Sequence, residues 1–227
     1  MRYAICSDAH GNRIFYDLCM NKIESYCVDR IIYLGDIFGY MDEGLYIKRD
    51  LINRGALVLK GNHEAMLLGE LPIDSEKDKI YGLKSQMIDM NKEDFEWIKK
   101  LPEEYELETS EGKIFFIHGS AENHINGYLY EDDESYGWNE PEYRMVFMGH
   151  THRSFFKKVN NSTIFVNVGS IGLPRDIGNR PSFCILDTSN MSVEMVNFLV
   201  DDVFFHDVFF QNVNNKVMEV LNRRWKK

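Results

Sequence analysis

The stretch that decides the fold reads Tyr3-Ala4-Ile5-Cys6-Ser7-Asp8-Ala9-His10, an apolar run followed at once by a polar loop. Four apolar residues ending at a Ser-Asp pair predict a short buried strand. The pattern recurs at 31–34, before Gly35-Asp36, and at 56–59, before Gly61-Asn62-His63. Apolar residues at helical spacing fill 15–28 and 45–54 between them. Strand–helix–strand–helix–strand is typical of a parallel sheet with crossover helices.

The rest of the chain predicts a second group of strands. Residues 64–101 are helical in character, and the pattern changes beyond Pro102. We expect strands at 105–109, 113–117, 145–148, 154–159, 163–168, 183–187 and 193–199, and a last helix over about 211–225. This order favours an α/β fold with two stacked mixed sheets flanked by helices. The 227 residues predict a single domain.

Composition limits the classes of function. No apolar run approaches the roughly 20 residues of a membrane span, and the N-terminus leaves no room for a signal core, so we expect a cytoplasmic protein without membrane contact. A net charge of −10 argues against binding long nucleic acids or anionic membranes. The basic run 223–227 is expected in the last turn of the C-terminal helix, where it would complement the helix dipole.

Polar side chains follow the predicted strands at one end. They are Asp8, His10, Asp36, Asn62, His63, His118, His150 and His152. Ligands of open α/β sheets bind outside the carboxyl ends of the strands, so these loops can converge on one spot. Two pairs, Asp8/His10 and His150/His152, have an i, i+2 spacing that aims both side chains to the same side of an extended segment.

The residue types in this group predict a metal centre. Imidazole, carboxylate and amide oxygen suit Mn²⁺, Fe, Zn²⁺ or Ni²⁺, and the lack of cysteine argues against a structural zinc site. Seven candidates exceed the needs of one tetrahedral ion. They suit two ions roughly 3.5–4 Å apart that share a carboxylate, activate a water and clamp a phosphoryl group.

The order of the motifs resembles the calcineurin-like metallophosphoesterase family. The blocks are Asp8-Ala9-His10, Gly35-Asp36, Gly61-Asn62-His63-Glu64, His118 and Gly149-His150-Thr151-His152, which match D-x-H, G-D, G-N-H-[DE], H and G-H-x-H. Residues 167–170 and 174–176 are similar to the segment after G-H-x-H in the small bacterial phosphodiesterase branch.

The resemblance implies a four-layer αββα sandwich and a role for each residue. Asp8, His10 and His152 would hold the first metal, and Asn62, His118 and His150 the second. Asp36 would bridge both metals, together with a hydroxide that attacks phosphorus. His63 would stabilise the transition state and protonate the leaving oxygen. Two divalent ions against two carboxylates leave a net charge of +2, which can hold a phosphate in an acidic protein.

Each residue also has a structural alternative. Gly-Asp after a strand is often a turn or a cap, and Asn62 suits a left-handed turn. Six of the seven histidines nevertheless fall in motif positions or beside them, which such alternatives leave unexplained; His124 is expected to be structural or peripheral.

Two further residues are candidates for binding the substrate. Asn12 is expected to donate to a phosphate oxygen, or else to cap the following helix. Arg175 is expected to clamp phosphate, or else to pair with Asp176 or another carboxylate.

The predicted function is a phosphoesterase that uses two divalent ions, Mn²⁺ first and Mg²⁺ among the others, on a small phosphorylated substrate. A phosphodiesterase or nucleotide phosphatase is favoured. Serine/threonine protein phosphatases of the superfamily carry G-D-x-V-D-R-G and R-G-N-H-E, whereas this chain lacks the first arginine and has Lys60 at the second. Activity like that of Ap4A hydrolases stays open. A non-catalytic scaffold is the competing class, although every motif residue is present.

Two stretches remain without a firm interpretation. Residues 131–134 are acidic and are expected either to form a solvated surface or to overhang the site and repel large polyanions. The aromatic residues of 203–210 are expected to pack in the core; if exposed, they would suggest a contact in a homo-oligomer.

Overall fold

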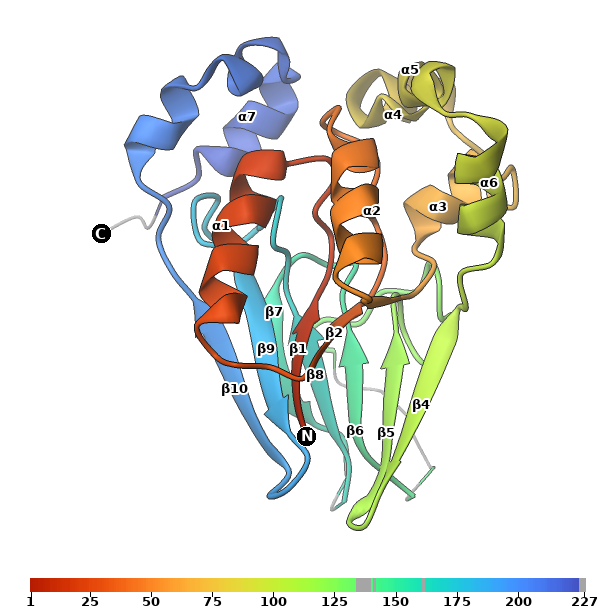
Figure 1. The fold of residues 1–227 in the computed structure, drawn as a ribbon, viewed down its shortest axis with the longest axis vertical. Coiled ribbons are helices and arrows are strands. Elements are labelled where there is room, and N and C mark those ends of the chain that lie inside the picture. Colours follow the sequence, from red (N-terminus) through yellow and green to blue (C-terminus); the bar gives the residue numbers. More distant parts are fainter. Residues whose placement is uncertain (134–139, 141, 161, 225–227) are drawn as a thin grey trace.

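The computed structural model describes residues 1–133, 140, 142–160 and 162–224 (Figure 1). Within these residues, the strands form two five-stranded sheets. The first has the order β10-β9-β1-β2-β3. Its strands are β1 (Arg2–Cys6), β2 (Arg30–Tyr33), β3 (Leu57–Val58), β9 (Ser182–Asp187) and β10 (Ser192–Asn197). β1, β2 and β3 are parallel, and β9 is antiparallel to both of its neighbours, so the sheet is mixed.

The second sheet has the order β4-β5-β6-β8-β7. Its strands are β4 (Glu104–Thr109), β5 (Gly112–Ile117), β6 (Tyr143–Met148), β7 (Ser154–Lys158) and β8 (Ile164–Val168). The three central strands are parallel and the two edge strands antiparallel. An apolar layer that includes Ile5, Phe116 and Phe147 joins the facing sides of the sheets, because alternate residues of each strand point inward.

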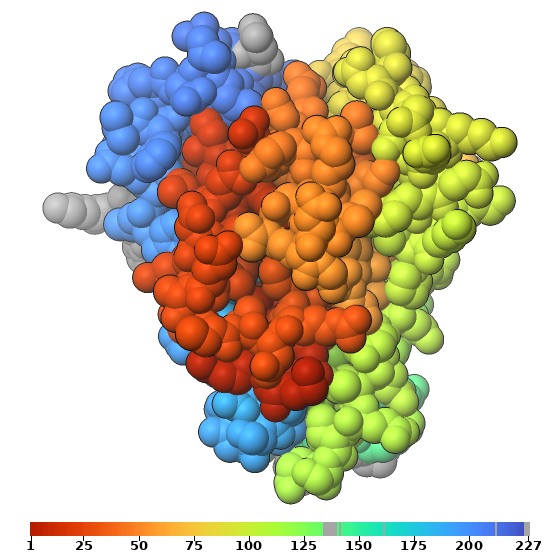
Figure 2. Space-filling model, in the orientation of Figure 1, coloured from red at the N-terminus to blue at the C-terminus, as the bar shows by residue number. Residues whose placement is uncertain are grey.

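Helices cover the outer face of the first sheet. They are α1 (Arg13–Glu24), α2 (Gly44–Asn53), α3 (Asn62–Leu67), α4 (Ser75–Tyr81), α5 (Leu83–Asp89) and α6 (Lys92–Lys99). Figure 2 shows α1 and α2 on this face, between the C-terminal segment and α4–α6. Apolar side chains of α1 and α2, among them Cys19, Ile23 and Ile47, pack against Ala4 and Ile185 of the sheet. In the described part of the chain, no helix has the length and apolarity needed to cross a bilayer.

The predicted fold class, two mixed sheets flanked by helices, is confirmed. The layer outside the second sheet differs in detail from the helical layer implied by the family. Within the described residues no helix lies between β5 and β10, and the loop 119–133 covers this face with Leu129 against Phe165 and Met148. Glycine and asparagine in this loop favour turns over a continuous helix. Whether 1–227 is a single domain stays a prediction.

The predicted C-terminal helix over 211–225 is wrong in its bounds. Two 3₁₀ helices, η1 (Asp202–His206) and η2 (Val208–Asn212), precede α7, which spans only Asn215–Leu221. Asn214 accepts a hydrogen bond from the Lys216 amide and so begins the helix. Arg223 and Arg224 lie beyond its end, where Arg224 donates to the Leu221 carbonyl and pairs with Asp202. Residues 225–227 lie outside the described chain.

The aromatic stretch 203–210 divides into a packed and an exposed part. Phe205 and Phe210 stack on each other and contact Phe15 of α1, which fits the expected core packing. Val203 and Val208 are exposed. An oligomer contact over these valines stays a prediction.

Candidate metal centre

The predicted ligand residues lie at the carboxyl ends of parallel strands from both sheets. Asp8 and His10 follow β1, and Asp36 follows β2; Asn62 opens α3 after β3. His118 follows β5, and His150 and His152 follow β6. All seven side chains are buried. The structure therefore brings together the residues that strand-end spacing had predicted to converge.

The first group consists of Asp8, His10 and His152, whose candidate ligand atoms all lie within 4.8 Å of one another. His10 Nδ1 faces the Phe38 carbonyl at 3.0 Å, and His152 Nδ1 faces the Leu173 carbonyl at 2.7 Å. A carbonyl only accepts hydrogen bonds, so both Nδ1 atoms carry a proton and both Nε2 atoms are free to act as ligands. The two Nε2 atoms, 3.0 Å apart, then face each other with lone pairs.

Asp8 adds further negative charge at the same point. Its Oδ1 lies 3.2 Å from His152 Nε2 and has no hydrogen-bond partner, although it is buried. Converging lone pairs without a donor repel one another unless a cation lies among them. This group therefore fits a bound divalent ion.

The second group consists of Asp36, His118 and His150. His118 Nδ1 faces the Leu34 carbonyl at 3.0 Å, so Nδ1 carries a proton and Nε2 is the ring atom directed at the centre. That Nε2 lies 3.1 Å from Asn62 Oδ1 and 3.5 Å from Asp36 Oδ1. His150 Nε2 is buried without a hydrogen-bond partner. Without a metal, the positive charge at this point comes from the His118 ring, and a metal ion can take its place, so this group also fits a cation.

Asp36 lies between the two groups. Its Oδ1 faces His118 of the second group, and its Oδ2 lies 3.6 Å from His10 Nε2 of the first. The backbone amide of His63 donates to Oδ1 at 2.9 Å and fixes the carboxylate. A carboxylate with one oxygen toward each group has the placement of a bridging ligand.

The electrostatics of the centre favour charged carboxylates. Burial alone would raise the pKa values of Asp8 and Asp36, but the facing imidazoles outweigh it and hold both well below the ordinary value. Burial lowers the pKa of His150 to about 3. For His118, burial is outweighed by the charge of Asp36, which raises its pKa to about 9. The acidic charge at the centre thus attracts positive charge, as a metal site requires.

The backbone of the ligand loops is unusual. Asp8, His10, Asp36, His150 and His152 all have positive φ angles, between 49° and 63°. Non-glycine residues seldom adopt this left-handed region, and such residues cluster at functional sites. Gly61 lets the loops approach, since a Cβ atom there would lie 2.2 Å from Asp36 Oδ1. The ligand loops are therefore held in conformations that local sequence preference does not favour.

Glu64 holds two of these loops together, a role that the sequence analysis did not assign. Its fully buried carboxylate accepts hydrogen bonds from the amides of Asp36 at 2.7 Å, Ile37 at 2.8 Å and Gly61 at 2.9 Å. Asn167 does the same for the last ligand loop, because its amide donates to Gly149 O. Glu64 is the last residue of the block 61–64, and Asn167 begins the segment 167–170. Their place in these motifs was the sequence feature that could have indicated a supporting role.

Replacing Glu64 by glutamine is expected to destabilise the fold by about 2–4 kcal/mol, because one carboxylate oxygen becomes an NH₂ group facing backbone donors. Urea unfolding of the metal-free protein measures this. The control is Glu76→Gln, which removes an exposed pair with Lys79 and should change stability by less than about 0.5 kcal/mol. Equal effects of the two substitutions would contradict the anchoring role of Glu64.

His63 lies beside the two groups and is covered by tyrosines. Its Nδ1 faces the Phe38 carbonyl at 3.0 Å, the same carbonyl that His10 contacts. The ring stacks on that of Tyr40, with centroids 5.2 Å apart, and packs at a tilt against that of Tyr81, with centroids 4.9 Å apart. Burial lowers the pKa of His63 to about 3, against the opposing charge of Asp36. His63 also groups with His10 and Asp36 within ligand distance, beside both candidate metal positions.

The two predicted substrate-binding residues have different outcomes. Asn12 is fully buried; its Oδ1 accepts the Phe15 amide and its Nδ2 donates to Gly172 O. These contacts make it the N-cap of α1 and contradict a role in phosphate binding. Arg175 instead donates to the Tyr40 hydroxyl at 3.2 Å, while Asp176 pairs with Arg180.

Arg175 keeps its place as a phosphate-binding candidate. No carboxylate among the described residues forms an ion pair with it, so the alternative of pairing with Asp176 is not what the structure shows. Its amide donates to His152 O, and its charge adds to burial in lowering the pKa of His152 to about 4. The guanidinium thus stands beside the first group of ligands.

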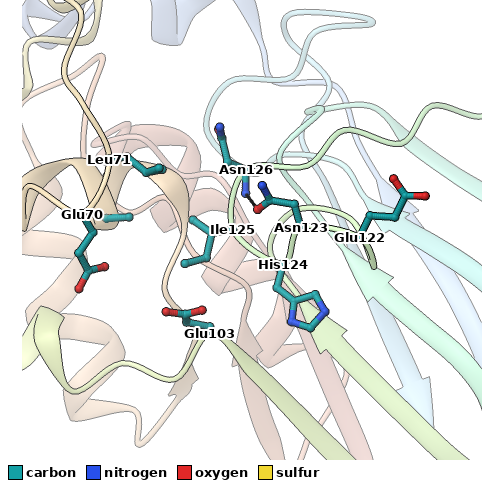
Figure 3. A pocket seen from close by; sticks show the side chains of 9 residues that line it. Glu70, Leu71, Glu103, Glu122, Asn123, His124, Ile125 and Asn126 are labelled. Carbon is teal, nitrogen blue, oxygen red and sulfur yellow. Dashed lines mark hydrogen bonds between the residues drawn. The ribbon is translucent and has the colours of Figure 1, made fainter.

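A separate acidic hollow of about 480 Å³ lies between the segment 65–71 and the loop 122–126 (Figure 3). His124 lines it and pairs with Glu104 at 2.6 Å, in line with the structural role expected for it. Lys60, at the position of the phosphatase arginine, is buried and pairs with two of the residues that line the hollow, Glu70 and Glu103. Three glutamates, Glu70, Glu103 and Glu122, line the hollow, which disfavours an anionic substrate in it.

The acidic stretch 131–134 is solvated over its described part. Glu131, Asp132 and Asp133 are exposed, and Lys157 of β7 donates to the carbonyls of Glu131 and Asp133. Glu134 lies outside the described residues. The alternative that the stretch repels large polyanions stays a prediction.

Comparisons with known proteins agree with this picture. The chain is 27% identical over 243 residues to the uncharacterised protein MJ0912 of Methanocaldococcus jannaschii, with 97% of this chain and 96% of that protein covered. The hypothetical protein PH1004 of Pyrococcus horikoshii OT3 has a similar structure, with a TM-score of 0.79 at 18% identity, over 100% of this chain and 99% of that one. A metallophosphoesterase from Sphaerobacter thermophilus gives a TM-score of 0.74 at 18% identity, over 97% and 98%.

The family assignment comes from the sequence itself. Residues 1–191 match the family model of the calcineurin-like phosphoesterase superfamily domain. All five motif blocks lie inside this range. Because the match spans most of the chain, this protein belongs to the calcineurin-like phosphoesterase superfamily, whose members are metal-dependent.

Proposed function

We propose that this protein hydrolyses small phosphate esters with two divalent metal ions, as a phosphodiesterase or nucleotide phosphatase. The observation that carries the proposal is the placement of Asp36, with one carboxylate oxygen toward His10 and the other toward His118. A single-metal site would not need a carboxylate shared between two groups of acceptors. Two ions, each with its own histidines and joined through Asp36, account for all of the buried lone pairs described above.

The ligand sets follow from the two groups. Asp8, His10 and His152 would hold one ion, Asn62, His118 and His150 the other, and Asp36 both. When bound, the ions supply Lewis-acid polarisation of phosphate oxygens and activation of the attacking water. Mn²⁺ is the first choice among Mn²⁺, Fe, Zn²⁺, Ni²⁺ and Mg²⁺, because oxygen and imidazole ligands are combined without thiolate.

The side chains around the ions bind and orient the substrate. Arg175, beside His152 and free of a carboxylate partner in the described chain, can contact a phosphate oxygen through its planar donor fork. His63, held by Phe38 and between two tyrosines, is placed to act on the leaving oxygen. Glu64 keeps the loops of Asp36 and Gly61 fixed, so the ligands need little rearrangement during turnover.

Small esters are favoured over phosphoproteins. Lys60 stands where protein phosphatases have the arginine of R-G-N-H-E. It forms an ion pair with Glu70 and does not point toward the metal ligands. The net charge of −10 disfavours long polyanions. A structure described as a putative diadenosine tetraphosphatase shares the fold at a TM-score of 0.57, and dinucleoside polyphosphates therefore belong in a substrate panel. A non-catalytic scaffold is disfavoured because no ligand is missing.

The test is hydrolysis of bis(p-nitrophenyl) phosphate by purified protein with and without metal. We expect activity with Mn²⁺, loss of it in EDTA, and recovery when Mn²⁺ is restored in excess. As a control, circular dichroism of the EDTA-treated protein should show the same folded fraction as before treatment, so that the loss of activity is not due to unfolding. Full activity of the metal-stripped protein would contradict the proposal. So would a protein with two bound metal ions that hydrolyses none of the aryl monoesters, diesters, cyclic nucleotides and dinucleotides.

A further inference from the structure

Aromatic rings lead from the metal centre to the surface on one side. The ring of Tyr128 packs on that of His150, with centroids 4.1 Å apart and planes tilted by 40°. Tyr130 continues outward, stacked on Tyr128 with centroids 6.1 Å apart and planes within 14°. Both tyrosines come from the loop after β5, far in sequence from His150. Tyr128 therefore contacts both the proposed metal ligand His150 and the outer ring of Tyr130.

These two rings are accessible. Tyr128 is 52% exposed and Tyr130 38% exposed, although the ligands that they lead to are buried. Two neighbouring exposed rings present a flat apolar surface on which another ring can stack. The Tyr130 amide donates to Asp133 Oδ2 at 2.7 Å, which closes a local turn at this point of the loop. The two rings therefore form an exposed aromatic platform next to the centre.

The platform lies beside the phosphate-binding candidate. The Arg175 amide donates to the carbonyl of His152 at 3.1 Å, two residues along the ligand loop from His150, on which Tyr128 packs. The Arg175 side chain donates to Tyr40, whose ring packs edge-on against that of His10. A cation for phosphate and a flat apolar surface for a ring are the two elements that a nucleotide requires, since nucleobases stack on aromatic side chains in a sequence-tolerant way.

We propose that Tyr128 and Tyr130 form a base-stacking subsite, so that the substrate is a phosphate ester of a nucleoside. This inference rests on the proposed function and names its substrate class. The phosphate occupies the metal centre beside Arg175, and the base packs on the exposed tyrosines. Glu131 and Asp132, exposed next to Tyr130, disfavour a continuing polyphosphate chain in that direction, which favours small nucleotides over nucleic acid.

The test compares two ligands that differ only in the base. Binding of AMP and of ribose 5-phosphate to the Mn²⁺-loaded protein is measured by calorimetry, and each titration is checked for released phosphate. We expect AMP to bind about 5- to 150-fold more tightly, the range of one stacked base. In Tyr128→Leu this preference should disappear through weaker AMP binding alone, while Tyr128→Phe should keep it. Tyr130→Leu should reduce the preference, and Phe204→Leu, at an equally exposed ring of η1, should not change it.

The outcomes separate the subsite from other roles. If Tyr128 only supports His150, then Tyr128→Leu weakens both ligands equally, and the inference is overturned. Equal affinity of the wild-type protein for the two ligands also overturns it, while Mn²⁺-dependent hydrolysis of the aryl diester would leave the proposed function standing. A clear preference for AMP without hydrolysis of any ester would contradict the proposed function and keep the nucleotide subsite.

Discussion

Asp36→Asn is expected to lower kcat for an aryl phosphodiester by more than about 10³-fold and to reduce the bound metal to one ion or less. Asparagine has nearly the same shape but carries no charge. Its NH₂ group would also point either at His10 Nε2 or at His118 Nε2, where the carboxylate now presents an oxygen. Two ions would lose both their shared ligand and one of the two negative charges that balance them.

The measurement combines metal analysis with steady-state kinetics on the same preparation. Asp94→Asn is the matched control, since it is also a buried aspartate but pairs with Lys48, away from the ligands. This control should lower the melting temperature and leave the kcat of the folded protein near its wild-type value. An Asp36→Asn protein that retains two metal ions and wild-type turnover would refute the bridging role.

The sequence predicted the parts of the site that local pattern encodes. Each ligand follows an apolar run, and strands are among the easiest elements to place when polar loops end them. Parallel β1, β2 and β3 then bring Asp8, Asp36 and Asn62 to one edge, as the crossover topology demands. The convergence of residues far apart in sequence was therefore a consequence of topology rather than of any single motif.

Features that depend on tertiary contact were not predictable in the same way. The left-handed conformations of Asp8 and His150 run against local preference and are maintained by surrounding hydrogen bonds, such as that from the His150 amide to Asp8 Oδ2. Asn12 fitted both capping and phosphate binding, and only the contacts to Phe15 and Gly172 decided between them. The apolar spacing after residue 211 predicted a longer helix than the cap at Asn214 permits.

The platform of Tyr128 and Tyr130 shows the same limit for function. Nothing in the loop sequence connects these tyrosines with His150, because the contact joins two strand ends of the second sheet. Scattered aromatic residues in a polar loop are ordinary in a sequence. Their meaning depends on what they face.

His63→Ala is expected to lower turnover by about 10²–10⁴-fold, the usual contribution of a general acid, while the metal content stays near that of the wild type. The seven proposed ligands remain in this variant. His63→Asn serves as a second variant, because it fills more of the space between Tyr40 and Tyr81. Loss of one ion in both variants would make His63 a ligand, as its distance to His10 and Asp36 allows.

The choice of leaving group distinguishes acid catalysis from simple hydrogen bonding. A p-nitrophenolate leaves as a stable anion and needs little help from a proton, whereas an alkoxide needs it strongly. If His63 protonates the leaving oxygen, the variant should lose far more activity with an alkyl ester than with the aryl ester. If the charged His63 ring only hydrogen-bonds to the phosphate through Nε2 and transfers no proton, both esters should lose activity equally. Because the two outcomes differ in a ratio of rates measured on one variant, partial misfolding or partial metal loss would cancel from the comparison.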